Sequence, residues 1–205
     1  MKIARILPLI FAMLLAAPAF AAQAVDTPPK TVIQQSLDGI LEILDVRQNK
    51  EKLSGDDRAK IRKVLNNRFD YGEMAKRSLG SPWRNLDAAG KKHFTMLFQD
   101  LLERSYGNRL AKEYHNQKMI ISDPVEKNDK VRINVDAVDD QKTIPMEFYL
   151  YQTPTGWQVY NIVIEGVSLI STFRTDFKAQ VEKDGLDGLI KALEEKVEKL
   201  KKEEA

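Results

Sequence analysis

A run of large apolar residues from Trp157 to Ile164 constrains this chain more than any other segment, because it is typical of a strand with bulk on both faces. Side chains alternate between the two faces of a strand. That rule predicts Trp157, Val159 and Val163 on one face and Tyr160, Ile162 and Ile164 on the other. A strand with one face in water should alternate polar and apolar residues. This strand is therefore predicted to lie deep in a core or along the wall of an apolar cavity, and to end at Gly166 before an amphipathic helix from Val167.

The apolar pattern divides the rest of the chain into helices followed by strands. Helical spacing predicts a helix over residues 31–47. A capping box over residues 54–57 opens a second helix, and Asp87 can cap a long third helix that continues at least to Tyr106. From Lys118 the period changes to two, and short turns separate successive strands, which is typical of an antiparallel meander. Helices before and after a compact run of strands predict an α+β domain, with several helices packed on a twisted antiparallel sheet of about four strands.

The N-terminal residues have the features of a secretory signal peptide. Lys2 and Arg5 precede a short apolar run, and small residues stand at the cleavage positions Ala19-Phe20-Ala21. We therefore expect an exported protein whose signal peptide covers residues 1–21 and is cleaved near Ala21. The expected parts after it are a tether over 22–30, a single domain over 31–190 and a charged helical tail over 191–205.

Charge and cysteine content exclude some classes of protein and site. The formal net charge is +2, and it falls to zero once Lys2 and Arg5 are removed with the signal peptide. Proteins that bind nucleic acid usually carry a clear basic excess, so we expect no nucleic-acid partner. The chain contains no Cys, so we expect neither a disulfide nor a lipid anchor attached through Cys.

Familiar catalytic motifs are missing or incomplete. The nearest approach to a hydrolase elbow is Gly166-Val-Ser168-Leu-Ile170, in which a β-branched Ile replaces the second Gly. Ser168 is better interpreted as a cap of the following helix. His93 and His115 do not form a zinc-binding pattern, and no Gly-x-x-x-x-Gly-Lys loop for phosphate is present. We therefore expect neither an enzyme nor a metal site nor a cofactor.

Two longer motifs resemble those of a known family. The first comprises Phe69-Asp70-Tyr71, Met74-Ala75-Lys76-Arg77, Leu79-Gly80 and Trp83. The second runs from Val159 to Ile170 and is followed by Arg174 and Phe177. Together they resemble the MlaC family of periplasmic phospholipid-binding proteins, which belong to an ABC transport system linked to toluene tolerance and outer-membrane lipid asymmetry. The resemblance extends over nearly the whole chain after the signal peptide.

The resemblance implies a soluble periplasmic phospholipid carrier with a lipid cavity between sheet and helices. It also implies two partners, an inner-membrane ABC transporter complex and an outer-membrane lipoprotein complex. We expect the carrier to be a monomer that binds no cofactor besides the phospholipid it transports. The side chains expected to contact lipid are Phe69, Tyr71, Met74, Phe94, Phe98, Leu101, Tyr106, Met146, Phe148, Leu150, Trp157, Val159, Val163, Val167 and Phe173.

The residues alone leave other interpretations open. Periodicity by itself would place these apolar side chains in an ordinary core. A periplasmic chaperone or adaptor, which holds apolar protein segments instead of lipid, would show the same composition. A lipid hydrolase acting through Ser168 is the third hypothesis, and the incomplete elbow argues against it.

Overall fold

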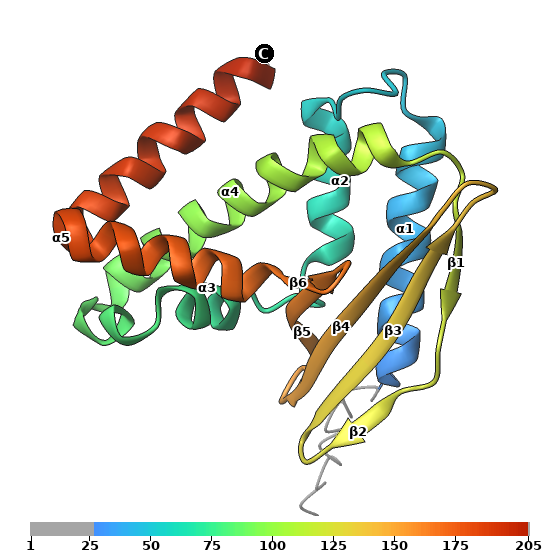
Figure 1. Ribbon diagram of the computed structural model, residues 1–205, viewed down its shortest axis with the longest axis horizontal. Helices are drawn as coiled ribbons and strands as arrows, with labels where there is room; N and C mark the ends of the chain where they lie inside the picture. The colour runs from blue at the N-terminus through green and yellow to red at the C-terminus, as the bar shows by residue number, and fades with distance from the viewer. Residues whose placement is uncertain (1–26, 205) are drawn as a thin grey trace, which may run out of the picture.

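The computed structural model describes residues 27–204. The expected signal peptide, its cleavage site and most of the expected tether lie outside the described residues. Five α-helices and one antiparallel sheet make up the described part of the chain (Figure 1). The sheet lies at one side of the molecule, with α1 behind its strands and α2 beside α1 (Figure 1). Helices α3, α4 and α5 pack together on the side of the molecule next to β5 and β6 (Figure 1). The α+β class predicted from the sequence is confirmed.

The helices are α1 Pro29–Val46, α2 Gly55–Leu65, α3 Tyr71–Leu79, α4 Ala88–Glu113 and α5 Leu169–Glu204, with a short 3-10 helix η1 at Ser81–Asn85. Helices α2 and α4 begin where the capping residues Ser54 and Asp87 predict. Ser54 and Asp57 form a reciprocal capping box at the start of α2. Asp87 accepts a hydrogen bond from the Gly90 N–H group at the start of α4, at 2.7 Å. Helix α1 begins two residues inside the expected tether, with Pro29 in its first turn, where proline is tolerated.

The sheet is a meander with a broken edge strand. Its strands are β1 Lys118–Ile121, β2 Val125–Lys127, β3 Lys130–Val138, β4 Thr143–Thr153, β5 Gly156–Ile164 and β6 Val167–Ser168. The order is β1-β3-β4-β5-β6, and β2 pairs with β3 next to β1. The sheet has six strands rather than about four for two reasons. The segment containing Pro124 interrupts the edge strand between β1 and β2, and β6 contains only two residues.

A β-bulge lies in the middle of β5. Leu150 of β4 pairs with Val159, but its neighbour Tyr149 pairs with Asn161, so Tyr160 is an extra residue with no partner of its own on β4. Such an extra residue disrupts the ladder and reverses the alternation of side chains beyond it. The bulge therefore decides which residues of β5 face the helices.

The sequence prediction for the faces of this strand is wrong after the bulge. Ile162 pairs with Phe148 and therefore shares a face with it and with Val159, which lies before the bulge. Val163 pairs with Glu147, which lies on the opposite face of β4. Strict alternation would place Val163 on the same face of the strand as Val159, but the extra residue puts them on opposite faces.

The strand β5 ends in a tight hairpin. Ile164 pairs with Val167, which leaves Glu165 and Gly166 as a two-residue loop. Both loop residues have positive φ, 51° and 79°, as a type I′ turn requires. The predicted helix therefore begins at Leu169 instead of Val167, because residues 167–168 form β6 first.

Helices α3, α4 and α5 pack around a cluster of aromatic side chains. The rings of Phe94 and Phe177 lie 5.7 Å apart edge to face, and those of Phe98 and Phe173 lie 5.2 Å apart in the same manner. Edge-to-face pairs of this kind stabilise a core beyond the area that they bury. This cluster makes the helical end of the molecule a densely packed body beside the sheet.

The long helix α5 changes direction at Gly185, whose φ is 73°. Beyond this residue its second arm runs parallel to α4 (Figure 1), with His93 2.8 Å from Glu194 and Lys201 3.9 Å from Asp100. Leu193 and Val197 of this arm are buried. The expected boundary between domain and tail at residue 190 therefore falls inside a continuous arm that packs on the domain.

Candidate functional site

An apolar cavity of about 400 Å³ lies between one face of the sheet and helices α1, α2 and α4. Its wall combines apolar side chains of the three helices with those of β3, β4 and β5, including Leu37, Ile61, Leu102, Phe148 and Ile162. A few polar and charged side chains interrupt this wall. Pockets of about 300–1,000 Å³ with an apolar lining and a few placed polar groups are typical ligand sites.

Six of the side chains that the sequence suggested for lipid contact line this cavity. They are Phe69, Tyr71, Tyr106, Met146, Phe148 and Val167. They come from four different parts of the chain, which the sheet and α4 bring together. The segment before α3 is held against the sheet because the Asp70 N–H group donates to the Val159 carbonyl at 2.9 Å.

The other nine suggested side chains lie outside the cavity wall. Seven are buried in the core: Met74, Phe94, Phe98, Leu101, Leu150, Val159 and Phe173. Trp157 packs at the margin of that core, and Val163 lies on the opposite face of the sheet from Ile162. Contact of these nine with lipid stays a prediction from the sequence.

Several lining residues were not among those suggested by the sequence. They belong mainly to α1 and α2, with further members on the strands: Ile33, Leu37, Ile40, Leu41, Ile61, Leu65, Met119, Ala137, Ile144, Ile162 and Ile164. Helical spacing marks the members on α1 and α2 as apolar and inward-facing. Spacing does not distinguish a side chain that packs against a neighbour from one that borders a cavity.

Charged residues stand at two places in the wall. At one, Arg109 of α4 lies 2.8 Å from Glu113 and 3.9 Å from Glu165 of the β5–β6 hairpin. At the other, Arg58 of α2 reaches α4, where it donates hydrogen bonds to the Glu103 carbonyl at 3.2 Å and to the Asn108 side chain at 2.6 Å. The first place carries one positive and two negative charges, whereas at the second a guanidinium group joins α2 to α4.

Tyr71 is the unusual polar residue in the wall. Ser36 and Gln117, which also line the cavity, have hydrogen-bond partners in the protein. The hydroxyl group of Tyr71 is buried and has no hydrogen-bond partner among the described residues. Burial, and then the nearby negative charge of Glu103, raise the pKa of Tyr71 well above its usual range. The hydroxyl group therefore stays protonated and can donate a hydrogen bond to a ligand.

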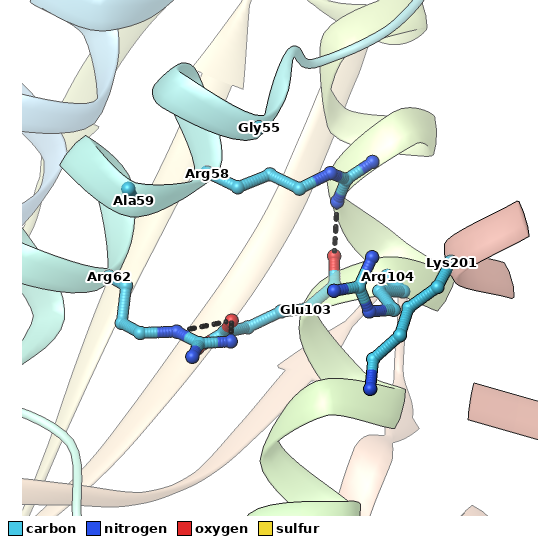
Figure 2. Close-up of a pocket in the computed structure, with 7 residues that line it drawn as sticks. All are labelled: Gly55, Arg58, Ala59, Arg62, Glu103, Arg104 and Lys201. Atoms are coloured by element: carbon cyan, nitrogen blue, oxygen red, sulfur yellow. Dashed lines mark hydrogen bonds and ion pairs between the residues drawn. The ribbon is translucent and has the colours of Figure 1, made fainter. Parts of the chain in front are cut away.

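A second hollow, the basic groove, lies between α2, α4 and the second arm of α5. It has a volume of about 460 Å³ and is lined by Gly55, Arg58, Ala59, Arg62, Glu103, Arg104 and Lys201. Figure 2 shows these side chains around the groove, with Arg62 bonded to the carboxylate of Glu103 and Arg58 to its carbonyl. Arg58 and Glu103 line both the groove and the apolar cavity, so the two hollows adjoin.

Ser168 has a structural role at the start of α5. Its hydroxyl oxygen accepts a hydrogen bond from the Ser171 N–H group at 3.2 Å, as expected for a helix cap. The same hydroxyl group donates to the Asn161 side chain at 3.2 Å. The interpretation of Ser168 as a cap is confirmed.

The described part of the chain has neither a cluster of metal ligands nor a membrane-spanning helix. No group of three or more His, Cys, Asp or Glu side chains in this part of the chain could hold a metal ion. Within the same residues, no helix has the length and apolar character needed to cross a membrane.

Comparison with known proteins identifies the family. The family described as MlaC protein matches residues 34–195, which is most of the chain. The chain belongs to the MlaC family. One relative is the intermembrane phospholipid transport system binding protein MlaC of Haemophilus influenzae, which is 25% identical over 179 residues, covering 83% of this chain and 82% of the relative. Another is a toluene tolerance protein of Pseudomonas putida, which is 26% identical over 182 residues, covering 85% of this chain and 82% of the relative.

A solved structure has the same fold. It is the phospholipid-binding protein of Ralstonia solanacearum, determined in complex with a phospholipid. The TM-score is 0.74 at 20% identity, and the match covers 85% of this chain and 99% of that one. The α+β fold predicted from the pattern of helices and strands is therefore confirmed by a solved structure as well.

Proposed function

We propose that this MlaC-family protein is a periplasmic phospholipid carrier that holds acyl chains in the apolar cavity. The observation that carries the proposal is the cavity of about 400 Å³ between the sheet and α1, α2 and α4, in a chain of this family. The naming of a relative as a phospholipid transport protein, and the phospholipid in the complex of similar fold, support it.

The energetics of acyl chains explain why a carrier needs an enclosed site. A diacyl phospholipid has about 30 methylene groups, and exposing each to water costs roughly 0.8 kcal/mol, or about 24 kcal/mol in total. That exceeds the strongest non-covalent affinities, which reach roughly 18–21 kcal/mol. A shallow groove would leave much of this cost in place, whereas an enclosed apolar wall removes it. Transfer between a membrane and such a cavity then needs little net free energy.

The proposed transport route connects two membranes. The carrier receives or delivers lipid at an outer-membrane lipoprotein complex and at an inner-membrane ABC transporter complex, and it acts as a monomer. The chain itself uses no fuel, because the partner complex hydrolyses ATP. Helices α1 and α2 pack chiefly against each other, so a small separation of this pair from the sheet would widen the cavity for lipid.

Native mass spectrometry tests the proposal. The signal-cleaved protein is purified from periplasm without detergent, weighed, extracted with solvent and analysed for lipid. We expect intact phospholipid at a fixed ratio to protein. A mass without ligand that persists after incubation with phospholipid vesicles would contradict the proposal. A bound peptide or protein segment would instead favour a chaperone or adaptor, and lysolipid or fatty acid products lost on Ser168→Ala would favour a hydrolase.

A further inference from the structure

Four of the described residues in the wall of the apolar cavity are exposed to solvent, and all four stand at one place. Arg109 and Leu110 are neighbours on α4, and Glu165 and Val167 belong to the β5–β6 hairpin. The other described residues of the wall are buried or half-buried. The cavity therefore reaches the surface between α4 and the hairpin. This opening, bounded by the four exposed residues, is called the portal below.

Two of the portal residues are apolar although they face water. Leu110 is 39% exposed and Val167 is 57% exposed. Single exposed apolar side chains are common on protein surfaces and need no function. Met96 on the same helix is such a residue, since it is 50% exposed and does not line the cavity. Leu110 and Val167 differ from it because each also borders the cavity, so an acyl chain passing the portal would exchange one apolar contact for another.

The two charged portal residues form an ion pair across the opening. The Nη2 atom of Arg109 lies 3.9 Å from the Oε2 atom of Glu165, and both side chains are more than half exposed. Arg109 also lies 2.8 Å from Glu113 of its own helix. Exposed ion pairs contribute little to stability. The pair across the portal can therefore break and form again without disturbing the fold.

The α4 side of the portal is attached to α1. The Arg47 guanidinium group, just after α1, donates a hydrogen bond to the Ala111 carbonyl at 2.6 Å. The Tyr114 hydroxyl group, just after α4, donates to the Asp45 carboxylate at 2.8 Å. The end of α4 should therefore follow α1 when α1 separates from the sheet.

The hairpin side of the portal is attached to the sheet. The Glu165 N–H group donates to the Pro145 carbonyl of β4 at 2.9 Å, and the Ser168 hydroxyl group donates to the Asn161 side chain of β5 at 3.2 Å. The two sides of the portal therefore belong to different parts of the molecule. A small separation of these parts breaks the ion pair and widens the portal.

We propose that the acyl chains of a phospholipid enter and leave the cavity through the portal, and that the Arg109–Glu165 ion pair is the latch that closes it. Leu110 and Val167 contact the acyl chains in transit. This proposal rests on the proposed phospholipid binding and adds the route of the ligand and the residues that control its rate of exchange.

Cross-linking tests the route. The chain contains no Cys, so the double variant Arg109→Cys/Glu165→Cys has two thiols and no others. The variant is loaded with pyrene-labelled phosphatidylcholine, and a reducible bis-methanethiosulfonate reagent then joins the two sides of the portal. Release of the lipid to acceptor vesicles should slow by about tenfold or more, because packed side chains elsewhere in the wall do not admit an acyl chain. Reduction of the cross-link should restore the rate.

A matched pair controls for the cross-link itself. The double variant His93→Cys/Glu194→Cys also joins α4 to another element, at a wild-type contact of 2.8 Å, but neither residue lines the cavity. The same reagent should leave its release rate unchanged. Slowing of both cross-linked proteins to the same extent would overturn the route, since it would show an effect of general rigidity.

A second test of the route needs one thiol and no cross-link. A bulky polyethylene glycol maleimide attached to Val167→Cys should obstruct the portal and slow lipid release several-fold. The same label on Met96→Cys, which is similarly exposed and lies outside the cavity wall, should not slow it. Equal rates for the two labelled proteins would contradict the proposal.

The latch is tested by charge removal. Glu165→Gln removes the ion pair across the portal and should speed release by roughly 1.5- to 5-fold, the effect expected of an exposed pair. Glu113→Gln removes the partner of Arg109 within α4 and leaves the pair across the portal, so it should not speed release. Equal acceleration by the two variants would show an effect of local charge and refute the latch.

Other outcomes would move the route without affecting the proposed function. Normal release from the cross-linked portal would place the route elsewhere in the wall. A further pair, Lys30→Cys/Asp123→Cys, ties the start of α1 to the segment between β1 and β2 at a 2.7 Å ion pair. If this cross-link blocks release and the one across the portal does not, lipid passes between α1 and the sheet edge. Absence of lipid binding by wild type would instead refute the proposed function itself.

Discussion

A Cβ atom on Gly107 would lie 2.8 Å from the Nη1 atom of Arg58, so the glycine in α4 leaves room for a guanidinium group that crosses from α2. Arg58 there donates to the Glu103 carbonyl and the Asn108 side chain. These contacts of Arg58 lie where the apolar cavity adjoins the basic groove. The contact therefore explains why α4 carries a glycine in its interior, where glycine is usually unfavourable.

This contact predicts that the effect of Gly107→Ala on stability depends on whether Arg58 is present. Replacing Gly by Ala inside a helix normally stabilises it by about 1 kcal/mol. In the wild-type background we expect Gly107→Ala to raise the free energy of unfolding by less than about half of this amount, because the new methyl group displaces Arg58. In an Arg58→Ala background most of the gain should return. Urea unfolding of the four proteins gives the coupling free energy, and strictly additive effects would contradict the contact.

The β5–β6 hairpin offers a second prediction. Glu165 has a φ of 51°, which is unfavourable for a glutamate and common for asparagine. Glu165→Asn should raise the free energy of unfolding by about 0.5–1 kcal/mol, because Asn-Gly is a preferred type I′ sequence. The control Glu165→Gln removes the same charge and its 3.9 Å pair with Arg109 without easing the backbone. Equal stability of the two variants in thermal unfolding would show that the turn is not strained.

The carboxyl group of Asp139 should make the stability of the folded protein fall at acidic pH. Its carboxylate accepts hydrogen bonds from the N–H groups of Gln141 and Lys142 and from the side chain of Gln117, in that order of effect, and these hold its pKa below the usual 3.8. A pKa lowered on folding means that the ionised group stabilises the folded protein above about pH 3.8, and that this stability is lost as pH falls through the folded-state pKa.

Asp139→Asn tests this dependence. The variant should have a lower urea midpoint than wild type at pH 7, because the amide is a poorer acceptor. The difference should shrink as the pH falls from about 3.8 through the lower folded-state pKa, because the wild-type carboxylate loses its charge over this range. A difference that stays constant from pH 7 to pH 3 would mean that ionisation of Asp139 does not contribute.

Local signals in the sequence were sufficient for most of the fold. Ser54 and Asp87 are capping residues whose effect depends on the next three residues only, so their helices could be predicted from a few letters. The period of two over β3 and β4 likewise reports one buried face. The turn at Gly185 was missed, since a single glycine inside a helical pattern does not show whether the chain turns there.

The cavity wall depended on features that the sequence pattern does not contain. The bulge at Tyr160 exchanges the faces of Ile162 and Val163, and no local residue preference announces it. Phe98 and Phe148 have the same apolar character and are both buried, but one packs between helices and the other borders the cavity. Which of these applies depends on the distance between elements far apart in the chain, and hydrophobic periodicity reports only burial.

The most direct test of the account compares two neighbours in β5. Ile162 lines the cavity, whereas Val163 lies on the opposite face of the sheet. Replacing either by Phe adds volume at one strand position, but only Ile162→Phe adds it inside the cavity. Overpacking costs about 1–3 kcal/mol, so the affinity of this variant for phospholipid should fall by about 5- to 150-fold.

The measurement is the number of phospholipid molecules that each folded variant retains in native mass spectrometry after purification from periplasm. The account predicts wild-type lipid content for Val163→Phe and a marked loss for Ile162→Phe. Full lipid content in Ile162→Phe, or an equal loss in both variants, would show that the acyl chains do not lie between this face of the sheet and helices α1, α2 and α4.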